Sequence, residues 1–191
     1  MLTKIQTQIE ESIQCKRILK DDQKTLKTIN HVVESCINSL KNNGKIIFAG
    51  NGGSFADAQH LSAEFVSRFM FDRAPLASVA LGVNGSAISA IGNDYGYENV
   101  FSREFEAIAE RNDIVVAIST SGNSPNIINL IKSANNNGIQ VFGFTGRNGG
   151  LMSNMCTCIN VPSDDTARIQ ESHILIGHII CGIVEEEYFK G

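Results

Sequence analysis

The chain has 191 residues and a formal net charge of −4, from 16 lysine and arginine side chains against 20 aspartate and glutamate side chains. Hydrophobic residues make up 42% of the chain, which is enough for a buried core and excludes general disorder. The mild acidity argues against nucleic-acid binding driven by overall charge. There is no run of about 18 apolar residues, so we expect no membrane-spanning helix.

The N-terminal segment has no apolar core of the kind that a signal peptide carries. The five cysteines are odd in number and include no Cys-x-x-Cys pair. This usage is typical of free thiols in a reducing compartment, and we therefore expect a cytoplasmic protein without disulfides. Cys156 and Cys158 fall in a predicted strand, where they would share one face and serve packing.

Two helices are predicted at the start of the chain. Apolar residues at helical spacing predict one over 24–43, and a weaker pattern predicts another over 1–19. Asp21 and Asp22 lie between them, and Gly44 is a suitable residue for the position just after the second helix. We interpret 1–43 as a helical extension of a single domain that covers residues 1–191.

After residue 44 the pattern alternates between short apolar runs and helical segments. Strands are predicted over 45–49, 76–81, 113–118, 139–144 and 156–161. Helices are predicted over 55–69, 125–136 and 166–189. Strands that alternate with helices predict an α/β fold, in which a parallel sheet is covered on both faces and binds ligands at the carboxyl ends of its strands.

The last predicted helix is apolar on nearly every side between Ile174 and Val184, which is typical of a buried helix. Gly177 and Gly182 lie inside it and cost roughly 1 kcal/mol each relative to alanine. The close approach of another helix would explain that cost. Because a chain of this size has little with which to surround a long helix, we expect a second subunit to bury it.

Two polar loops each follow a predicted strand and precede a helix: Gly50–Ser54 (GNGGS) and Ser119–Ser124 (STSGNS). Free N–H groups at the start of a helix favour a phosphate or carboxylate ligand. No Gly-Lys-Ser/Thr follows, which excludes a Walker loop, and Phe55 replaces the third glycine of a dinucleotide fingerprint. A small phosphorylated metabolite fits better than a nucleotide; ordinary turns with helix caps are the alternative. A third polar loop is predicted at 93–96, where a simple turn is the alternative.

His60 and Glu64 are four residues apart on a predicted helix and therefore share one face. They could bind one metal ion, or Glu64 could act as a base beside the phosphate loop; a surface hydrogen bond is the simpler alternative. His178 lies in the last helix, after a polar loop that begins at Asp164. For His178 the alternative is a hydrogen-bonded core histidine.

Gln170 and His178 are eight residues apart, which is about 12 Å along a continuous helix and about 80° around its axis. One continuous helix in one subunit can hardly bring both side chains to a single metal ion. Either the helix is interrupted or a neighbouring subunit supplies one of the two side chains.

Taken together, these motifs resemble the phosphoheptose isomerases, which are the sedoheptulose 7-phosphate isomerases of the sugar-isomerase (SIS) domain superfamily. The resemblance covers nearly the whole chain, whereas GNGGS and STSGNS alone indicate only an SIS domain. It rests on GNGGS, on Ala-x-His-x-x-x-Glu over 58–64, on GNDYG over 92–96, on ISTSGNS over 118–124 and on ARIQE-x-His-x-x-x-x-His over 167–178.

This resemblance implies a three-layer αβα sandwich and a homotetramer with sites between subunits. It implies conversion of sedoheptulose 7-phosphate to D-glycero-D-manno-heptose 7-phosphate, for lipopolysaccharide or capsule synthesis, with Glu64 and His178 as the acid–base pair. It implies one zinc ion per subunit, with the ligands His60, Glu64, Gln170 and His178. The implied substrate contacts are Asn51, Gly52, Gly53, Glu64, Asn93, Asp94 and Gln170, and the implied phosphate contacts are Ser119, Thr120, Ser121 and Ser124.

Two non-enzymatic interpretations compete with this one. One branch of close relatives associates with the bacterial replication initiator and lacks the acid–base pair, whereas Glu64 and His178 are both present here. Phosphosugar-sensing regulators usually carry a DNA-binding helix-turn-helix, for which this chain has no room beyond its N-terminal helices. The sequence therefore favours an enzyme with a small phosphosugar substrate and no nucleic-acid or membrane partner.

Overall fold

The computed structural model describes residues 1–190, and its centre is a sheet of five parallel strands. The spatial order of the strands is β2-β1-β3-β4-β5. Their bounds are β1 (Ile46–Gly50), β2 (Ser78–Ala80), β3 (Ile114–Ile118), β4 (Gln140–Thr145) and β5 (Thr157–Asn160). The predicted parallel sheet is therefore confirmed.

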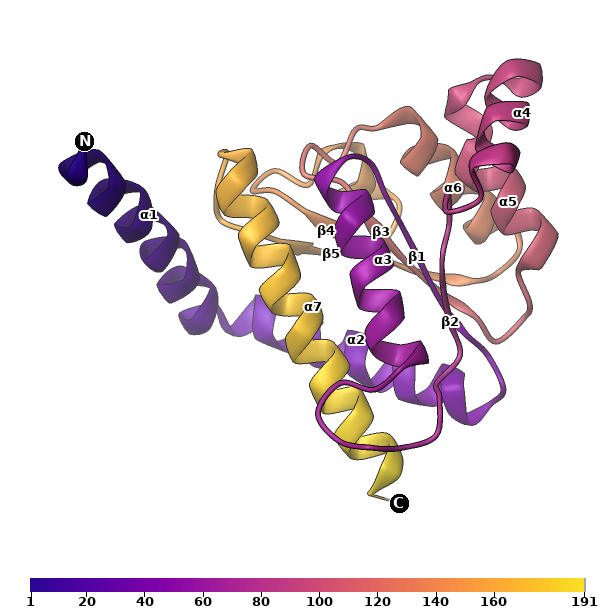
Figure 1. The fold of residues 1–191 in the computed structure, drawn as a ribbon, viewed down its shortest axis with the longest axis horizontal. Helices are drawn as coiled ribbons and strands as arrows, with labels where there is room; N and C mark the ends of the chain where they lie inside the picture. The colour runs from indigo at the N-terminus through magenta and orange to yellow at the C-terminus, as the bar shows by residue number, and fades with distance from the viewer. Residues whose placement is uncertain (191) are drawn as a thin grey trace.

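Helices cover both faces of this sheet and make a three-layer αβα sandwich (Figure 1). The first layer contains α2, α3 and α7, with α1 at its edge, and the opposite layer contains α5 and α6. Their bounds are α1 (Leu2–Asp21), α2 (Gln23–Lys41), α3 (Gly53–Val66), α4 (Gly85–Tyr95), α5 (Val100–Ile108), α6 (Pro125–Asn136) and α7 (Thr166–Phe189), with short 3₁₀ helices η1 (Tyr97–Asn99) and η2 (Gly150–Asn154). None of the helices within residues 1–190 has the length and hydrophobicity needed to cross a membrane.

The core is divided by the sheet because successive strand residues point to opposite faces. On β1, Ile46 and Phe48 pack toward α2, α3 and α7, whereas Ile47 and Ala49 pack toward α5 and α6. Every residue of β1 and β3 is buried. That burial on both faces explains why these strands read as continuous apolar runs in the sequence.

Strand β1 has β2 on one side and β3 on the other, so the winding of the sheet reverses between β1 and β3. In doubly wound sheets this switch point opens a crevice at the carboxyl ends of the strands. The loop after β1 is GNGGS and the loop after β3 is STSGNS. The fold therefore places both predicted anion-binding loops at the edge where such proteins bind ligands.

Several helix ends differ from the sequence predictions, and α3 ends at Val66 rather than at residue 69. Asn43, with φ of 61°, takes the left-handed position after α2 that was predicted for Gly44. Gly44 has a steric role instead, because a Cβ there would lie 2.2 Å from the carbonyl oxygen of Asn112. Asn93 and Asp94, predicted in a loop, lie in the last turn of α4.

Helix α7 is continuous, and Asp165 begins it by accepting the N–H groups of Ala167 and Arg168. A Cβ at Gly177 would lie 2.5 Å from Leu61 of α3, so the predicted close approach of a second helix is confirmed there. One face of α7 is buried within the chain. The other exposes Leu175, Ile179 and Ile183.

His173 anchors α7 to the sheet. Its ring is fully buried, and Nε2 donates to the carbonyl oxygen of Thr145 at the end of β4, 3.1 Å away. Burial lowers the pKa of His173 from 6.5 to about 4. The folded protein therefore keeps this ring neutral at a pH where the unfolded chain protonates it.

We expect this histidine to make the protein less stable as the pH falls. The unfolded chain takes up the proton near pH 6.5 and the folded chain only near pH 4, so stability present above pH 6.5 is lost in between, by up to about 3 kcal/mol. Urea unfolding at pH 7, 6 and 5 measures the loss. His173→Gln should lose less stability over this pH range than the wild-type protein. His31→Gln, a change on the exposed surface of α2, should lose as much as the wild type. Equal losses in the wild type and both variants would contradict the assignment of the effect to His173.

Candidate active site

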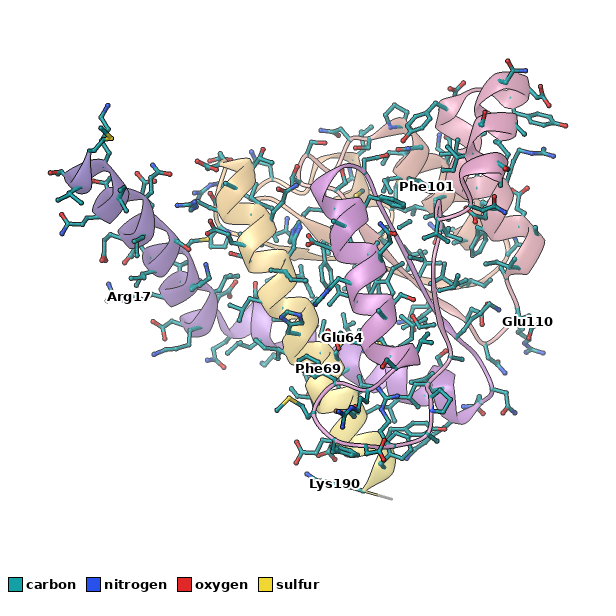
Figure 2. The ribbon with its side chains drawn as sticks, viewed as in Figure 1. Arg17, Glu64, Phe69, Phe101, Glu110 and Lys190 are labelled. Carbon is teal, nitrogen blue, oxygen red and sulfur yellow. The ribbon has the colours of Figure 1, made fainter. Side chains whose placement is uncertain are left out.

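The candidate active site begins where α3 and α7 lie side by side, and Figure 2 labels Glu64 and Phe69 at this place. The two helices run in the same direction, because Gly53 at the start of α3 meets Gln170 and Leu61, two turns later, meets Gly177. Later residues of α3 therefore lie opposite later residues of α7. The side chains of both helices therefore meet in sequence along one shared groove.

His60, Glu64 and His178 meet in this groove, and their potential ligand atoms all lie within 4.8 Å of one another. Nε2 of His60 is 2.8 Å from Nε2 of His178 and 3.2 Å from a carboxylate oxygen of Glu64. The His60 side chain is 51% exposed and that of Glu64 20%, so the cluster opens to solvent on the His60 side. Two imidazole nitrogens and one carboxylate oxygen are a donor set that suits zinc with an open position.

Gln170, the fourth predicted zinc ligand, lies elsewhere in the single chain. A Cβ at Gly53 would be only 2.6 Å from Nε2 of Gln170, which places this amide at the start of α3. Gly53 and His60 are seven residues apart, or about 10 Å along α3. The structure thus brings three of the four predicted ligands together, and the uninterrupted α7 keeps Gln170 away from His178 within one subunit.

The glycine-rich loop after β1 is held by an amide pair. Asn51 and Asn126 exchange two hydrogen bonds of 2.9 Å, and the Tyr97 hydroxyl donates to the same Asn51 oxygen at 3.3 Å. Gly52, with φ of 57° and ψ of −120°, has a backbone conformation that glycine adopts far more readily than other residues. Because Asn126 is buried on α6, this pair ties the GNGGS loop to the helix that follows the STSGNS loop.

The serine-rich loop after β3 gathers hydroxyl groups at the start of α6. Oγ of Ser119 lies 3.1 Å from Oγ of Ser124 and 3.5 Å from Oγ of Ser121. Thr120 and Ser121 also line a cavity of about 230 Å³ between this loop and the turn after β4. Hydroxyl donors beside a helix N-terminus, where N–H groups have no helical partner, are suited to a phosphate group.

Asn93 and Asp94 lie on the surface of α4, where Nδ2 of Asn93 donates to Oδ1 of Asp94 at 2.7 Å. Within residues 1–190, the hydrogen bonds of these two side chains do not connect them to Glu64 or His178. The nearby Tyr97 is the residue of this segment that reaches the loop after β1.

Sequence reasoning missed several residues that the structure places at this site. Asp57 lies one turn before His60 on α3; burial raises its pKa to about 6, whereas His60 acts to lower it. Asp57 lies three residues before His60, and this helical spacing could have predicted that the two side chains share one face of α3. Asn126 and Phe69 carried no such signal, because Asn126 acts through a partner 75 residues away and Phe69 lies after the end of α3.

The fold and the site define a doubly wound α/β protein with a glycine-rich and a serine-rich loop at its switch point, and the family model of the SIS domain matches residues 13–146. The phosphoheptose isomerase of Aneurinibacillus thermoaerophilus is 50% identical over 187 residues, which are 97% of this chain and 94% of that one. The solved phosphoheptose isomerase structures from Neisseria gonorrhoeae and Francisella tularensis are 39% and 34% identical, with TM-scores of 0.91 and 0.92, and each alignment covers 97% of this chain and 98% of the other. The chain therefore belongs to the phosphoheptose isomerase family of SIS domain proteins.

We expect the Asn51–Asn126 pair to stabilise the crevice measurably. Asn126→Leu leaves the half-buried amide of Asn51 without its partner on α6, which should lower the free energy of unfolding by about 1–3 kcal/mol. Asn136→Leu places the same side chain at an exposed position of the same helix and should change stability by less than about 0.5 kcal/mol. Urea unfolding compares the two variants, and equal losses would show that the amide pair contributes nothing special.

Proposed function

We propose that this protein is an aldose–ketose isomerase that converts sedoheptulose 7-phosphate to D-glycero-D-manno-heptose 7-phosphate. The observation that carries the proposal is the convergence of Glu64 and His178 from α3 and α7, since α3 begins in the first of the two predicted anion-binding loops at the switch point. Membership of the phosphoheptose isomerase family supports the same substrate class. The product would enter heptose synthesis for lipopolysaccharide or capsule, and we infer a cytoplasmic location for the reaction.

The proposed reaction moves a proton between neighbouring carbons through an enediol. A base removes a proton from C1 of the ketose, the C2 carbonyl becomes a hydroxyl, and a proton is delivered to C2 as C1 becomes the aldehyde. Glu64 and His178 meet across the groove and supply one carboxylate and one imidazole, which are groups suited to these transfers.

The phosphate at the far end of the sugar would be held by the hydroxyls of Ser119, Thr120, Ser121 and Ser124. The backbone of Asn51, Gly52 and Gly53, the side chains of Asn93 and Asp94, and Gln170 complete the proposed substrate contacts. The hydrogen bonds between Asn51 and Asn126 of α6 support this assignment, because they hold the first loop against the helix that follows the second, and a substrate that spans both loops would bind to preorganised groups.

The donor set of His60, Glu64 and His178 also fits zinc, and we propose these residues as its ligands together with Gln170. Zinc bound there would act as a Lewis acid that stabilises negative charge on a sugar oxygen.

We further propose that the protein is a homotetramer with sites between subunits. Helix α1 extends away from the sandwich (Figure 1) and leaves apolar side chains exposed, among them Leu2, Ile5 and Ile9. The uncovered face of α7 adds a second apolar surface. A neighbouring subunit would cover both, and it would supply the Gln170 that one chain holds away from its own His178.

The reaction predicts a sharp dependence on Glu64. Proton NMR of the protein with sedoheptulose 7-phosphate in D₂O, with and without added zinc, should show an aldoheptose signal and deuterium at C2. Glu64→Gln keeps the size of the side chain but removes the base, and should lower the rate by about 100-fold or more. Glu110→Gln, on the exposed surface after α5, is the matched control and should remain active.

An inactive wild-type protein, folded and supplied with zinc, would contradict the proposed function. The next test would be capture of the replication initiator, since binding there without isomerase activity is the behaviour expected of the non-catalytic alternative. If Glu64→Gln forms the aldose as fast as the wild-type protein, the isomerase activity stands and the proposed role of Glu64 is contradicted.

The proposed assembly predicts a molar mass in light scattering of four times the 20.7 kDa chain. Ile179→Glu places a charge on the exposed apolar face of α7 and should dissociate the tetramer, because burying an unpaired carboxylate in an apolar interface is costly. Lys27→Glu, an exposed change on α2, is the control. A monomeric wild-type protein at micromolar concentration would contradict the assembly.

A further inference from the structure

The imidazole of His178 lies between two other rings. The ring of Phe69 stacks on it, with centroids 5.5 Å apart and planes 18° from parallel. The ring of His60 meets it nearly edge-on, with centroids 5.0 Å apart and planes 67° apart. One face of the imidazole is thus covered by an aromatic ring, while its Nε2 lies 2.8 Å from Nε2 of His60, which in turn contacts Glu64.

Phe69 is not held by regular secondary structure, since α3 ends at Val66 and no helix or strand includes residues 67–77. The carboxylate of Glu185, two turns beyond His178 on α7, holds this segment instead. It accepts the backbone N–H of Phe69 at 2.8 Å and that of Met70 at 2.6 Å. Glu185 is fully buried, so these bonds are shielded from competing water.

Arg73 completes the arrangement from the other end of the segment. Its Nε donates to Glu185 at 2.8 Å, and both side chains are at most 2% exposed. Its remaining N–H groups donate to the carbonyl oxygens of Glu64, Phe65, Ser67 and Ala74 at 2.7–3.1 Å. Arg73 therefore joins the last turn of α3, the segment that carries Phe69, and the carboxylate on α7.

The Phe69 ring also lies beside Gly182, one turn beyond His178 on α7. A Cβ at this position would lie 3.4 Å from the ring, an ordinary van der Waals distance, so the ring is in contact with this turn of the helix. The sequence pattern suggested a neighbouring helix as the reason for this glycine. The structure shows that its neighbour is the aromatic ring that covers His178.

We propose that Phe69 is a positioning residue for His178, held in place by the buried Arg73–Glu185 pair. The inference rests on the proposed function, in which His178 transfers a proton and its ring plane therefore has to match the substrate. The terminal torsion of a histidine side chain is broad and is not set by the backbone. A fixed aromatic face restricts that torsion, and an acid–base group that loses its alignment loses rate even when the substrate still binds.

The first measurement reads the ring contact without using activity. In the full-length protein labelled with ¹³C-histidine, the ring protons of His178 should be displaced upfield by the ring current of Phe69. Phe69→Leu should remove this displacement, and Phe69→Tyr should keep it. Phe71→Leu is the matched control, because Phe71 contacts Phe189 and lies outside the stack on His178.

The second measurement uses steady-state kinetics of the zinc-supplied enzyme. Phe69→Leu should lower kcat about 10- to 100-fold with KM little changed, and Phe69→Tyr should restore most of the rate. Arg73→Lys cannot donate to Glu185 and to the four carbonyl oxygens together, so it should move the His178 signals in the same direction as Phe69→Leu.

Unchanged His178 signals in Phe69→Leu would overturn the inference, and so would a lost displacement with an unchanged kcat. A fall in kcat that Phe69→Tyr fails to restore would also overturn it. The NMR displacement needs no substrate. If it is present in a protein that has no isomerase activity, the proposed function is contradicted while the contact between Phe69 and His178 stands.

Discussion

The close packing of α3 against α7 is the constraint on which the rest of the site depends. Leu61 fills the space in which a side chain at Gly177 would lie, and the amide of Gln170 lies against Gly53. These two contacts, one at each end of the shared groove, fix the register of the helices. His60, Glu64 and His178 meet only because that register is set, since α3 and α7 are more than 90 residues apart in the chain.

The crevice at the switch point depends on a different kind of contact. The GNGGS and STSGNS loops follow neighbouring strands, and the amide pair between Asn51 and Asn126 holds the first loop against the helix that follows the second. Helix α3 begins in the first of these loops and carries His60 and Glu64 two and three turns later. The same helix thus links the edge of the sheet that carries the predicted anion-binding loops to the cluster of His60, Glu64 and His178.

The strands and most of the helices could be predicted because the spacing of their apolar residues is a local property of the sequence. The bounds predicted for α6 and α7 coincide with the structure, and both helices have helix-start signals in Pro125 and Asp165. The left-handed residue after α2 was placed one residue too far along, because Asn43 and Gly44 both suit this conformation and only the contact of Gly44 with Asn112 decides between them. No element was predicted over α5, whose strong amphipathic pattern follows a polar segment.

The candidate site was predictable to the extent that its residues form motifs. The meeting of His60, Glu64 and His178 was expected from the family resemblance rather than from spacing, since no local pattern joins residues 118 apart. Phe69, Arg73 and Glu185 could not be found in this way, because their contacts are long-range and Arg73 acts mainly on backbone oxygens. Helical spacing did, however, correctly indicate that Gln170 and His178 diverge within one chain.

Helix α3 also fixes the distance between the glycine-rich loop and the cluster of His60, Glu64 and His178. Its first turn touches the glycine-rich loop and its later turns carry the titratable side chains, so the distance between the two ends of the site equals a whole number of helical residues. Inserting one residue between Gly53 and His60 would lengthen this distance by about 1.5 Å and turn His60 by about 100° away from α7. The length of ligand that such a site accepts therefore cannot be adjusted in small steps along this helix. Divergence toward shorter or longer sugars is confined to the loops, where residues can be gained without breaking the register of α3 and α7.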